Sequence, residues 1–166
     1  MTTFAIQVAK WAEKTEADLN TVVQVAVLDI AKRVLERSPV GNPDLWKTPP
    51  PKGYVGGHFR ANWQYSTTQA PNGILDVIDN SDKGSATLGK IKASIVPDAM
   101  GKIHYITNNL PYAQRLEDGW STQASPSGIV ALTITEWGTI IDDAINGVRN
   151  GTSKEDFAQG FSTYGL

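Results

Sequence analysis

The stretch LNTVVQVAVLDIAKRVL, residues 19–35, places apolar side chains three or four residues apart throughout its length. This spacing predicts a long amphipathic helix over residues 1–37, which Pro39 ends because proline disfavours helical geometry in the residue before it. A break near Thr15 is an alternative, since Trp11 lies slightly off the later stripe. The apolar face consists of Leu19, Val22, Val23, Ala26, Val27, Ile30, Val34 and Leu35. Opposite lie charges of both signs, as is typical of a solvated face: Lys14, Asp18, Asp29, Lys32, Arg33 and Glu36.

Length and composition narrow the class of protein. A chain of 166 residues is long enough for one domain with its own core, expected over residues 1–150 and followed by a tail over residues 150–166. The absence of cysteine excludes disulfides, thiolate metal sites and a cysteine nucleophile. Because 15 Lys and Arg residues nearly balance 17 Asp and Glu residues, no basic surface for nucleic acid is expected. Neither a secretion signal nor a membrane-spanning segment is predicted.

Residues 38–57 are rich in proline and glycine and are expected to form a long loop. Five of the nine prolines lie here, and those at positions 49–51 are consecutive, which favours an extended and stiff polyproline II segment. Trp46 and Tyr54 are large apolar anchors of a kind that a disordered linker lacks. The composition therefore predicts an ordered loop with a function of its own.

Residues 58–128 are expected to contain strands, one short helix and loops. Trp63 and Tyr65 alternate with polar neighbours, which predicts a strand over residues 62–68. The turn signal Pro-Asn-Gly follows, so a second strand over residues 74–78 completes a predicted hairpin. The further elements predicted are a helix over residues 85–95, a strand over residues 102–107, a helical turn over residues 112–118 and a loop over residues 119–128.

The C-terminal region repeats the helical spacing of the N-terminal one. Residues 129–149 are predicted to form a helix, although β-branched residues make a strand over residues 131–135 an alternative. The tail has sparse apolar residues and is expected to form a short helix that docks only in an assembly: Phe157, Phe161 and Tyr164. The predicted class is α+β, with the long N-terminal helix and the C-terminal helix packed on a small, mainly antiparallel β-sheet with long loops rich in proline and glycine.

The segment GSATLGK, residues 84–90, matches the phosphate-binding loop of nucleotide-binding enzymes up to its final position. That position needs a serine or threonine hydroxyl for Mg²⁺, and Ile91 has no oxygen to offer. We favour an exposed loop that leads into a helix, with Lys90 solvated. A nucleotide-binding enzyme that uses this degenerate loop is an alternative function.

Other patterns for catalysis or metal binding are weak. His58 and His104 are the only histidines, and neither lies in a metal-ligand or serine-triad motif. The adjacent carboxylates at residues 117–118 and 142–143 point in different directions on a helix and form no acid–base pair. We therefore predict no catalytic residue, no cofactor, no metal ligand and no enzymatic activity.

Aromatic residues in or beside the predicted loops favour an interaction surface, because Trp and Tyr often anchor interfaces. Burial of the same residues in the core is an alternative of similar weight. The proline-rich residues 48–52 also allow two interpretations, either a polyproline ligand of an adaptor module or a stiff connector packed by Trp46 and Tyr54. The candidate residues for contacts between subunits or rings are Trp46, Lys47, Pro50, Tyr54, Tyr112, Trp120 and Gln123.

Three short motifs occur in an order that is similar to a known family. They are Ser38-Pro39-Val40-Gly41, then His58-Phe59-Arg60-Ala61-Asn62-Trp63, then Asn109-Leu110-Pro111-Tyr112-Ala113 through Leu116-Glu117-Asp118-Gly119. In this order and separation, over about residues 38–127, the sequence resembles the neck or tail-completion proteins of tailed bacteriophages, a class of minor tail proteins. The positions that fit the family's pattern are Ser38, Pro39, Val40, Gly57, Arg60, Trp63, Asn108 or Asn109, Tyr112, Ala113, Glu117 and Gly119.

The resemblance implies a structural virion protein that assembles as a ring, by resemblance a hexamer, where the head joins the tail. DNA would pass through the lumen without sequence-specific binding, and no membrane would be involved. The implied partners are further copies of the chain, the adjoining head-closure or connector protein, and the tail-terminator or tail-tube protein. The implied location is the neck of the virion, after synthesis in the cytoplasm of the bacterial host.

Two expectations about residues accompany this reading. The loops over residues 41–57 and 119–128 should contact neighbouring subunits or adjoining rings, because head-to-tail packing in a ring needs two different surfaces on each copy. Arg60 and Glu117 lie in motif segments, and the planar guanidinium suits a bidentate ion pair with a carboxylate. A solvated arginine beside an unrelated glutamate is the alternative to that structural ion pair.

Overall fold

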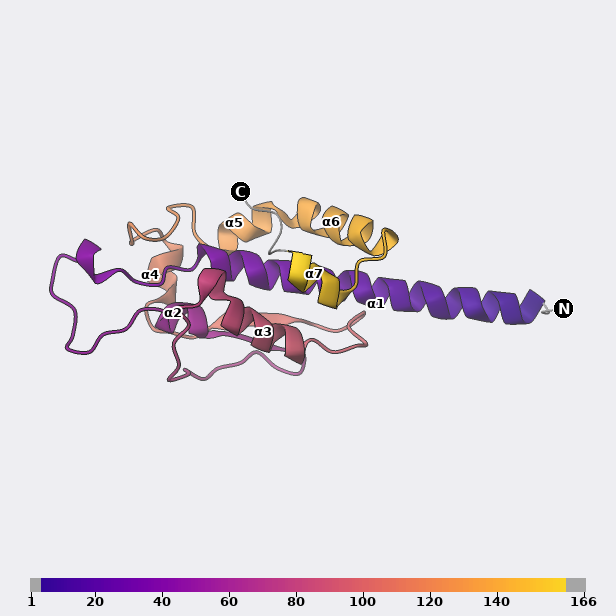
Figure 1. The fold of residues 1–166 in the computed structure, drawn as a ribbon, viewed down its shortest axis with the longest axis horizontal. Helices are drawn as coiled ribbons and strands as arrows, with labels where there is room; N and C mark the ends of the chain where they lie inside the picture. The colour runs from indigo at the N-terminus through magenta and orange to yellow at the C-terminus, as the bar shows by residue number, and fades with distance from the viewer. Residues whose placement is uncertain (1–3, 161–166) are drawn as a thin grey trace.

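The computed structural model, which describes residues 4–160, has an α+β fold arranged around one long helix (Figure 1). This helix, α1, is continuous through Thr15, so the alternative of a break there is wrong. The elements in chain order are α1 (Phe4–Arg37), η1 (Pro43–Leu45), α2 (His58–Ala61), β1 (Trp63–Ser66), η2 (Asp82–Gly84), α3 (Ser85–Ser94), β2 (Tyr105–Asn108), α4 (Ala113–Glu117), α5 (Val130–Thr135), α6 (Trp137–Arg149) and α7 (Lys154–Gly160).

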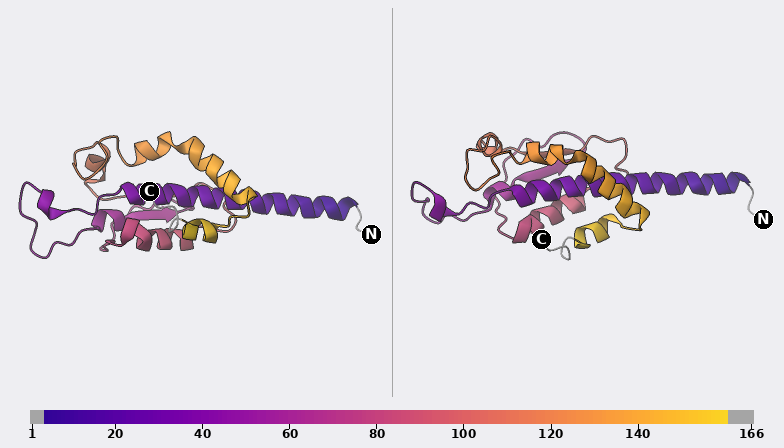
Figure 2. Two further views of the ribbon diagram at one scale, coloured as in Figure 1. Left: turned by 45° about the horizontal axis from the view of Figure 1, so that its top comes forward. Right: turned by 90° about the horizontal axis from the view of Figure 1, so that it is seen from above.

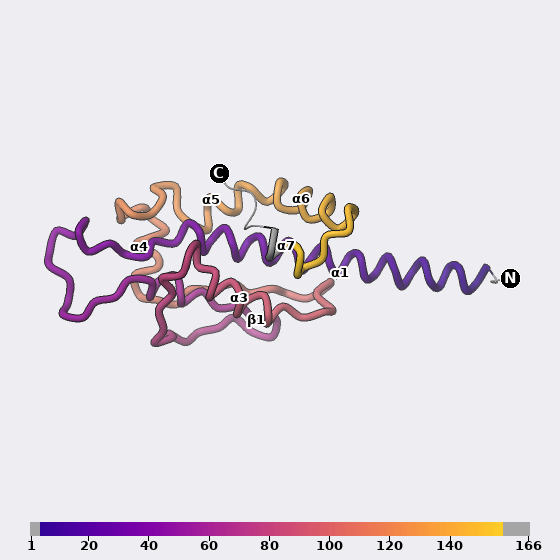
Figure 3. The backbone as a smooth tube through the Cα atoms, in the orientation of Figure 1, coloured from indigo at the N-terminus to yellow at the C-terminus, as the bar shows by residue number. Residues whose placement is uncertain are grey.

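Helix α1 lies along the long axis of the molecule, and the other elements surround only its second half (Figure 1). In that view α5 and α6 lie along one side of α1, while α3 and the sheet lie along the other. In both turned views in Figure 2, the first turns of α1 extend beyond all other elements. At the opposite end, the backbone of residues 38–57 forms a wide loop (Figure 3). The molecule therefore has a free helix at one end and loops at the other.

The core forms two clusters, and α1 contributes to both. In the larger cluster, Leu28 and Leu35 of α1 pack with Trp63 of β1 and Ile91 of α3. In the smaller cluster, Val25 and Ala26 pack against Ile140 and Ala144 of α6. Five consecutive residues of α1, from Val25 to Asp29, are buried, so this part of the helix is covered on several sides. Burial of each large aliphatic side chain contributes about 1.5–3 kcal/mol to this packing.

A strand forms within the predicted residues 102–107 but begins only at Tyr105, as β2, and the predicted hairpin is wrong. Strand β1 pairs antiparallel with β2, in a register that places Trp63 opposite Asn108, and no strand forms at residues 74–78. That segment is instead fixed by side chains. The Asn62 amide donates to the Leu75 carbonyl over 3.0 Å, and its oxygen accepts from the Leu75 N–H over 2.7 Å. Because the ladder joins residues far apart in the chain, no local turn signal could reveal it.

Most other predicted elements are confirmed, with one interruption. The helix expected over residues 85–95 is α3, and the helical turn after Pro111 is α4. The C-terminal helix is divided at Glu136 into α5 and α6, and the alternative of a strand over residues 131–135 is wrong. Helix α7 packs against α1 through Phe157, which contacts both core clusters. The tail therefore docks within one chain, whereas Phe161 and Tyr164 lie outside the described residues.

None of the helices over residues 4–160 is both long and apolar enough to cross a membrane.

Candidate functional site

An open pocket of about 460 Å³ lies at the loop end of the molecule, between residues 38–57 and α4. We call it the aromatic pocket. It is lined mainly by rings and aliphatic side chains, and four of the seven residues expected to make contacts meet in it. The residues that matter for its chemistry are Trp46, Tyr54, His58, Phe59, Tyr112 and Gln123. Burial of apolar area in a concave site with a few polar groups is the usual basis of a binding site.

The rings of the aromatic pocket support one another in two pairs. Trp46 and Tyr54 have ring centroids 4.7 Å apart at an interplanar angle of 58°, and Phe59 and Tyr112 have centroids 6.0 Å apart at 37°. Such tilted contacts are favourable for aromatic quadrupoles. Burial, and secondarily the neighbouring Tyr54, raises the pKa of Tyr112, so this phenol is neutral at neutral pH. Gly41 adopts a φ of +88°, and a side chain there would collide with the Tyr54 hydroxyl.

Gln123 joins the two loops that frame the aromatic pocket. Its Oε1 accepts a hydrogen bond from the Asn42 N–H over 2.6 Å, and its Nε2 donates to the Asn42 carbonyl over 3.1 Å. The Gln123 amide thus satisfies both the backbone donor and the backbone acceptor of Asn42, as a neighbouring strand would. The loop over residues 38–57 and the loop over residues 119–128 are held together by this pair of hydrogen bonds.

The other three predicted contact residues lie outside the aromatic pocket. Lys47 and Pro50 are exposed on the wide loop, and Trp120 is 75% exposed at the start of the second loop. The guanidinium of Arg115 lies 5.8 Å from the centre of the Trp120 ring. These residues are accessible on the same loops, but the structure does not bring them together with the pocket residues.

The expected ion pair between Arg60 and Glu117 is wrong, because each side chain has different partners. Arg60 is buried in α2, where its Nη1 donates to the Ser81 carbonyl and its Nη2 to the Ser38 carbonyl, both over 3.1 Å. Its Nε has no hydrogen-bond partner within residues 4–157. The Ser38 carbonyl lies just beyond the C-terminus of α1, where a cation complements the partial negative charge of the last carbonyls. Arg60 therefore ties α2 to the end of α1.

Glu117 instead caps helix α5 from the last residue of α4. Its two carboxylate oxygens accept hydrogen bonds from the N–H groups of Ile129, Val130 and Ala131 over 2.7–2.9 Å. Burial alone would raise the pKa of Glu117, but these three hydrogen bonds outweigh it and hold the pKa below its ordinary value. A Cβ at Gly128 would lie 2.5 Å from the Glu117 Oε1, so a glycine at that position leaves room for the cap.

Ser38 joins the end of α1 to strand β1 inside the core. Its hydroxyl donates to the Val34 carbonyl over 2.5 Å and accepts from the Trp63 indole over 2.7 Å, inside the core. Both Ser38 and Trp63 are buried. Since a buried hydroxyl and a buried indole N–H each need a partner, this pair fixes the exit of the chain from α1 relative to β1.

The segment GSATLGK forms the start of α3, and its donors for a phosphate are already used. The Asp79 carboxylate accepts from the Thr87 N–H over 2.8 Å, and the Ser81 hydroxyl accepts from the Ala86 N–H over 3.0 Å. Burial would raise the pKa of Asp79, but hydrogen bonds from Ser81 and Thr87 hold it below its ordinary value. Gly84 is buried against the Arg60 side chain. This segment is a capped helix start that offers no open cradle for phosphate.

The two histidines serve structural contacts. His58 Nε2 donates to the Leu75 carbonyl over 3.0 Å while its ring lines the aromatic pocket. His104 uses both nitrogens, toward the Tyr65 hydroxyl at 2.8 Å and the Ala99 carbonyl at 2.9 Å. Over the described part of the chain, no three His, Cys, Asp or Glu residues gather as they would to hold a metal ion. The chemistry of the aromatic pocket is thus that of binding through rings and amides.

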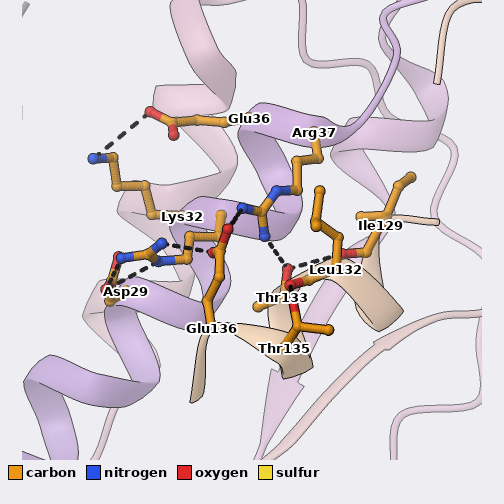
Figure 4. Close-up of polar contacts among 10 residues, drawn as sticks. Asp29, Lys32, Glu36, Arg37, Ile129, Leu132, Thr133, Thr135 and Glu136 are labelled. Atoms are coloured by element: carbon orange, nitrogen blue, oxygen red, sulfur yellow. Dashed lines mark hydrogen bonds and ion pairs between the residues drawn. The ribbon is translucent and has the colours of Figure 1, made fainter. Parts of the chain in front are cut away.

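Sequence reasoning missed a cluster of charges between α1 and the junction of α5 with α6 (Figure 4). Arg33 and Arg37 both reach the Glu136 carboxylate over 2.6 Å, Arg33 also binds Asp29, and Arg37 donates to the Thr133 hydroxyl over 2.6 Å. We call these five residues the arginine cluster. Hydrogen bonds from Arg37 and then Arg33 lower the pKa of Glu136. Asp29 is 3% exposed, so the expectation of a solvated face is wrong here.

No family model, no curated protein and no solved structure matches this chain.

Proposed function

We propose that this chain is a structural subunit of the head-to-tail connector of a tailed bacteriophage, and that its copies form a ring around the DNA channel. The observation that carries the proposal is the aromatic pocket, which gathers Trp46, Tyr54, Tyr112 and Gln123 from separate loops at one end of the molecule. Exposed aromatic side chains in a preformed concave site are typical of protein interfaces. The His58 imidazole in the pocket already donates from Nε2 to the Leu75 carbonyl.

The positions that carry the family resemblance support the proposal by their roles in the fold. Ser38 and Trp63 join the end of α1 to the sheet, and Arg60 binds the Ser38 carbonyl. Asn108 donates to the Phe59 carbonyl over 2.8 Å, and Glu117 caps α5. These contacts hold the framework around the two loops, so a pattern of such residues would preserve a scaffold for contacts with neighbours rather than a reaction centre.

The charge of the chain is compatible with a DNA channel through which DNA must slide. A formal net charge of −2 gives no strong attraction to phosphates, and binding of DNA through released counterions needs many basic contacts. In the proposed assembly the partners are other copies of the chain, the head-closure or connector protein, and the tail-terminator or tail-tube protein. The proposed location is the neck of the virion.

Co-expression with the products of the genes adjacent to its own tests this function. Native mass spectrometry and electron microscopy should detect a ring of this chain bound to portal, head-closure or tail proteins. Trp46→Ala and Tyr112→Ala should reduce incorporation by about tenfold or more, as expected for interface anchors. Leu45→Ala is the matched control, since Leu45 is 60% exposed on the same loop but does not line the pocket.

The outcome that would overturn the proposal is equally concrete. Adjacent genes without virion products, together with magnesium-dependent ATP binding that Lys90→Ala abolishes, would favour the nucleotide-binding alternative. The structure favours no such site, because the N–H groups of Ala86 and Thr87 are occupied. Binding of an isolated partner domain to the exposed residues 47–53, without any ring, would favour the adaptor alternative.

A further inference from the structure

The first turns of α1 carry an apolar face that remains uncovered in the described chain. Phe4 is 81% exposed, Trp11 is 68% exposed, and Val8 and Leu19 are exposed by nearly half. Successive members lie three or four residues apart when Thr15 is counted between them, so all four share one side of the helix. Figures 1 and 2 show this part of α1 extending beyond the other elements. Large aromatic side chains so exposed on one stripe are a sign of an interface.

This uncovered stripe continues an interface that already exists within the chain. The same helix face reaches Val22 and Ala26, which pack against Ile140 and Ala144 of α6. The change occurs at Asn20, whose Oδ1 accepts from the Met100 N–H over 2.8 Å. Beyond that point toward the N-terminus the stripe has the same composition but no neighbour within residues 4–157 that buries it. The surface that binds α6 farther along the helix therefore extends into solvent.

A second apolar surface lies on α5, in a groove of about 210 Å³ between α1, the sheet and α5. Its floor is Val34 and Trp63, which are 2% and 6% exposed. Its rim is Val130, Ile134 and Trp137, of which Ile134 and Trp137 are more than half exposed. The Thr133 hydroxyl in this groove already donates to the Ile129 carbonyl and accepts from Arg37. A groove of this kind suits an amphipathic helix that presents apolar anchors one turn apart.

We propose that the first turns of α1 from one copy of the chain lie in the α5 groove of a second copy. Because α1 is one continuous helix, its first turns point away from the α5 groove of their own chain. Arg33 and Arg37 beside the groove are neutralised by Asp29 and Glu136, so an apolar helix face that enters it leaves neither guanidinium unpaired. Each contact uses two different surfaces, and such a contact closes into a ring or continues as a filament.

Site-directed cross-linking tests this contact directly, because the chain has no cysteine. The Val8→Cys and Ile134→Cys variants, carried on separately tagged copies, are mixed and oxidised under mild conditions. The yield of the disulfide-linked heterodimer should exceed the yield from a mixture of Glu13→Cys and Ile134→Cys copies by about fivefold or more. A disulfide needs Cα atoms within about 7 Å of each other. Glu13 lies on the opposite face of the same helical turns and is the matched control.

A second pair of cysteine variants controls for weaker association caused by the loss of the Val8 and Ile134 side chains. Ala5→Cys and Thr135→Cys place the thiols beside the two surfaces and leave every large apolar residue intact. This pair should also cross-link, and Trp11→Ser on the Ala5→Cys copy should reduce the yield severalfold. Cross-links equal to the Glu13→Cys control in both pairs would overturn the proposal. The proposal would also be overturned if Val8→Cys copies cross-linked only to each other and not to Ile134→Cys copies. Binding of the first turns of α1 to anionic vesicles, without any cross-link between copies, would overturn it as well.

This inference rests on the proposed function only in that both require copies of the chain to associate. If the chain forms a complex with virion proteins but neither cysteine pair cross-links, the inference is overturned and the proposed function stays intact. A cross-linked ring that binds no product of the adjacent genes would support the inference and overturn the proposed function.

Discussion

The two halves of α1 have the same helical spacing but opposite surroundings. In the second half, Val25, Leu28, Ala31 and Leu35 are completely buried between α6, α3 and the sheet. In the first half, Phe4 and Trp11 are among the most exposed apolar residues described. The difference arises from the partners and not from the helix itself, because both halves form regular turns and the stripe runs unbroken from one into the other.

An amphipathic pattern therefore indicates that a neighbour covers the apolar face, but it does not indicate which chain supplies that neighbour. Short helices in water are only marginally stable by propensity alone, and most helical stability in proteins comes from packing of the apolar face. The first half of α1 has no such packing within the described residues, and we propose that a second copy of the chain supplies it. The aromatic pocket at the other end of the molecule has the same character.

The largest expected effect is in the covered half of α1. Leu28→Ala removes a fully buried side chain from the larger core cluster and should lower the free energy of unfolding by about 2–5 kcal/mol. Leu19→Ala, on the uncovered stripe, should cost under about 1 kcal/mol. Urea denaturation of the isolated chain measures both. Equal losses would show that the first half of α1 is packed within the chain.

The arginine cluster should have the next largest effect. Glu136→Ala leaves the guanidinium groups of Arg33 and Arg37 without their shared carboxylate, which should cost about 1–3 kcal/mol. The matched control is Asp18→Ala, which removes an exposed ion pair with Lys14 in the uncovered half and should cost under about 0.5 kcal/mol. Urea denaturation measures the free energy of unfolding of both variants. A loss for Asp18→Ala as large as that for Glu136→Ala would contradict this account.

The cap on α5 predicts a dependence on pH. The folded state holds the pKa of Glu117 below its unfolded value, so the carboxylate stabilises the fold above the unfolded pKa, and this contribution is lost as the pH falls through the folded pKa. Glu117→Gln should therefore cost about 1–2 kcal/mol at pH 7 and less at pH 3. The urea denaturation midpoints of Glu117→Gln and the original chain should differ less at pH 3 than at pH 7. Asp118→Asn, beside it and outside the cap, is the control at pH 7 and should cost under about 0.5 kcal/mol.

The smallest effect on stability is expected at Trp11. Trp11→Ser should change the free energy of unfolding of the isolated chain by under about 0.5 kcal/mol, because the side chain is 68% exposed. The same change should weaken self-association, which sedimentation measures at increasing protein concentration. A folded Trp11→Ser chain that associates as the original does would disprove a role for this face.

Much of the fold could be predicted because its local signals are strong. The repeated spacing in α1 and the proline that ends it, together with the turn at the start of α3, depend on neighbouring residues only. The pairing of Trp63 with Asn108 could not be predicted, since it joins distant segments without a turn signal. The gathering of Trp46, Tyr54, Tyr112 and Gln123 was expected only as a shared role, and their common pocket depends on the tertiary fold.

The errors also have physical causes. Asp29 and Arg33 were assigned to a solvated face because charges of both signs lie opposite the apolar stripe, but Asp29 is buried and Glu136, between α5 and α6, binds Arg33. The Arg60 and Glu117 pairing was expected because both residues lie in motif segments and a planar guanidinium suits a carboxylate. In the structure, backbone carbonyls satisfy the arginine and backbone N–H groups satisfy the carboxylate. Backbone groups are present at every position, so side-chain identity cannot show in advance where such contacts occur.

Hydrogen exchange along α1 tests the central claim most directly, namely that the uncovered surfaces of this chain are contacts between copies. In the dilute monomer, the amides of residues 22–37 should exchange slowly and those of residues 5–19 rapidly, because only the former half is packed. In the assembled form, residues 5–19 should become protected while residues 22–37 remain unchanged. Protection of residues 5–19 in the monomer, or rapid exchange there after assembly, would contradict this account.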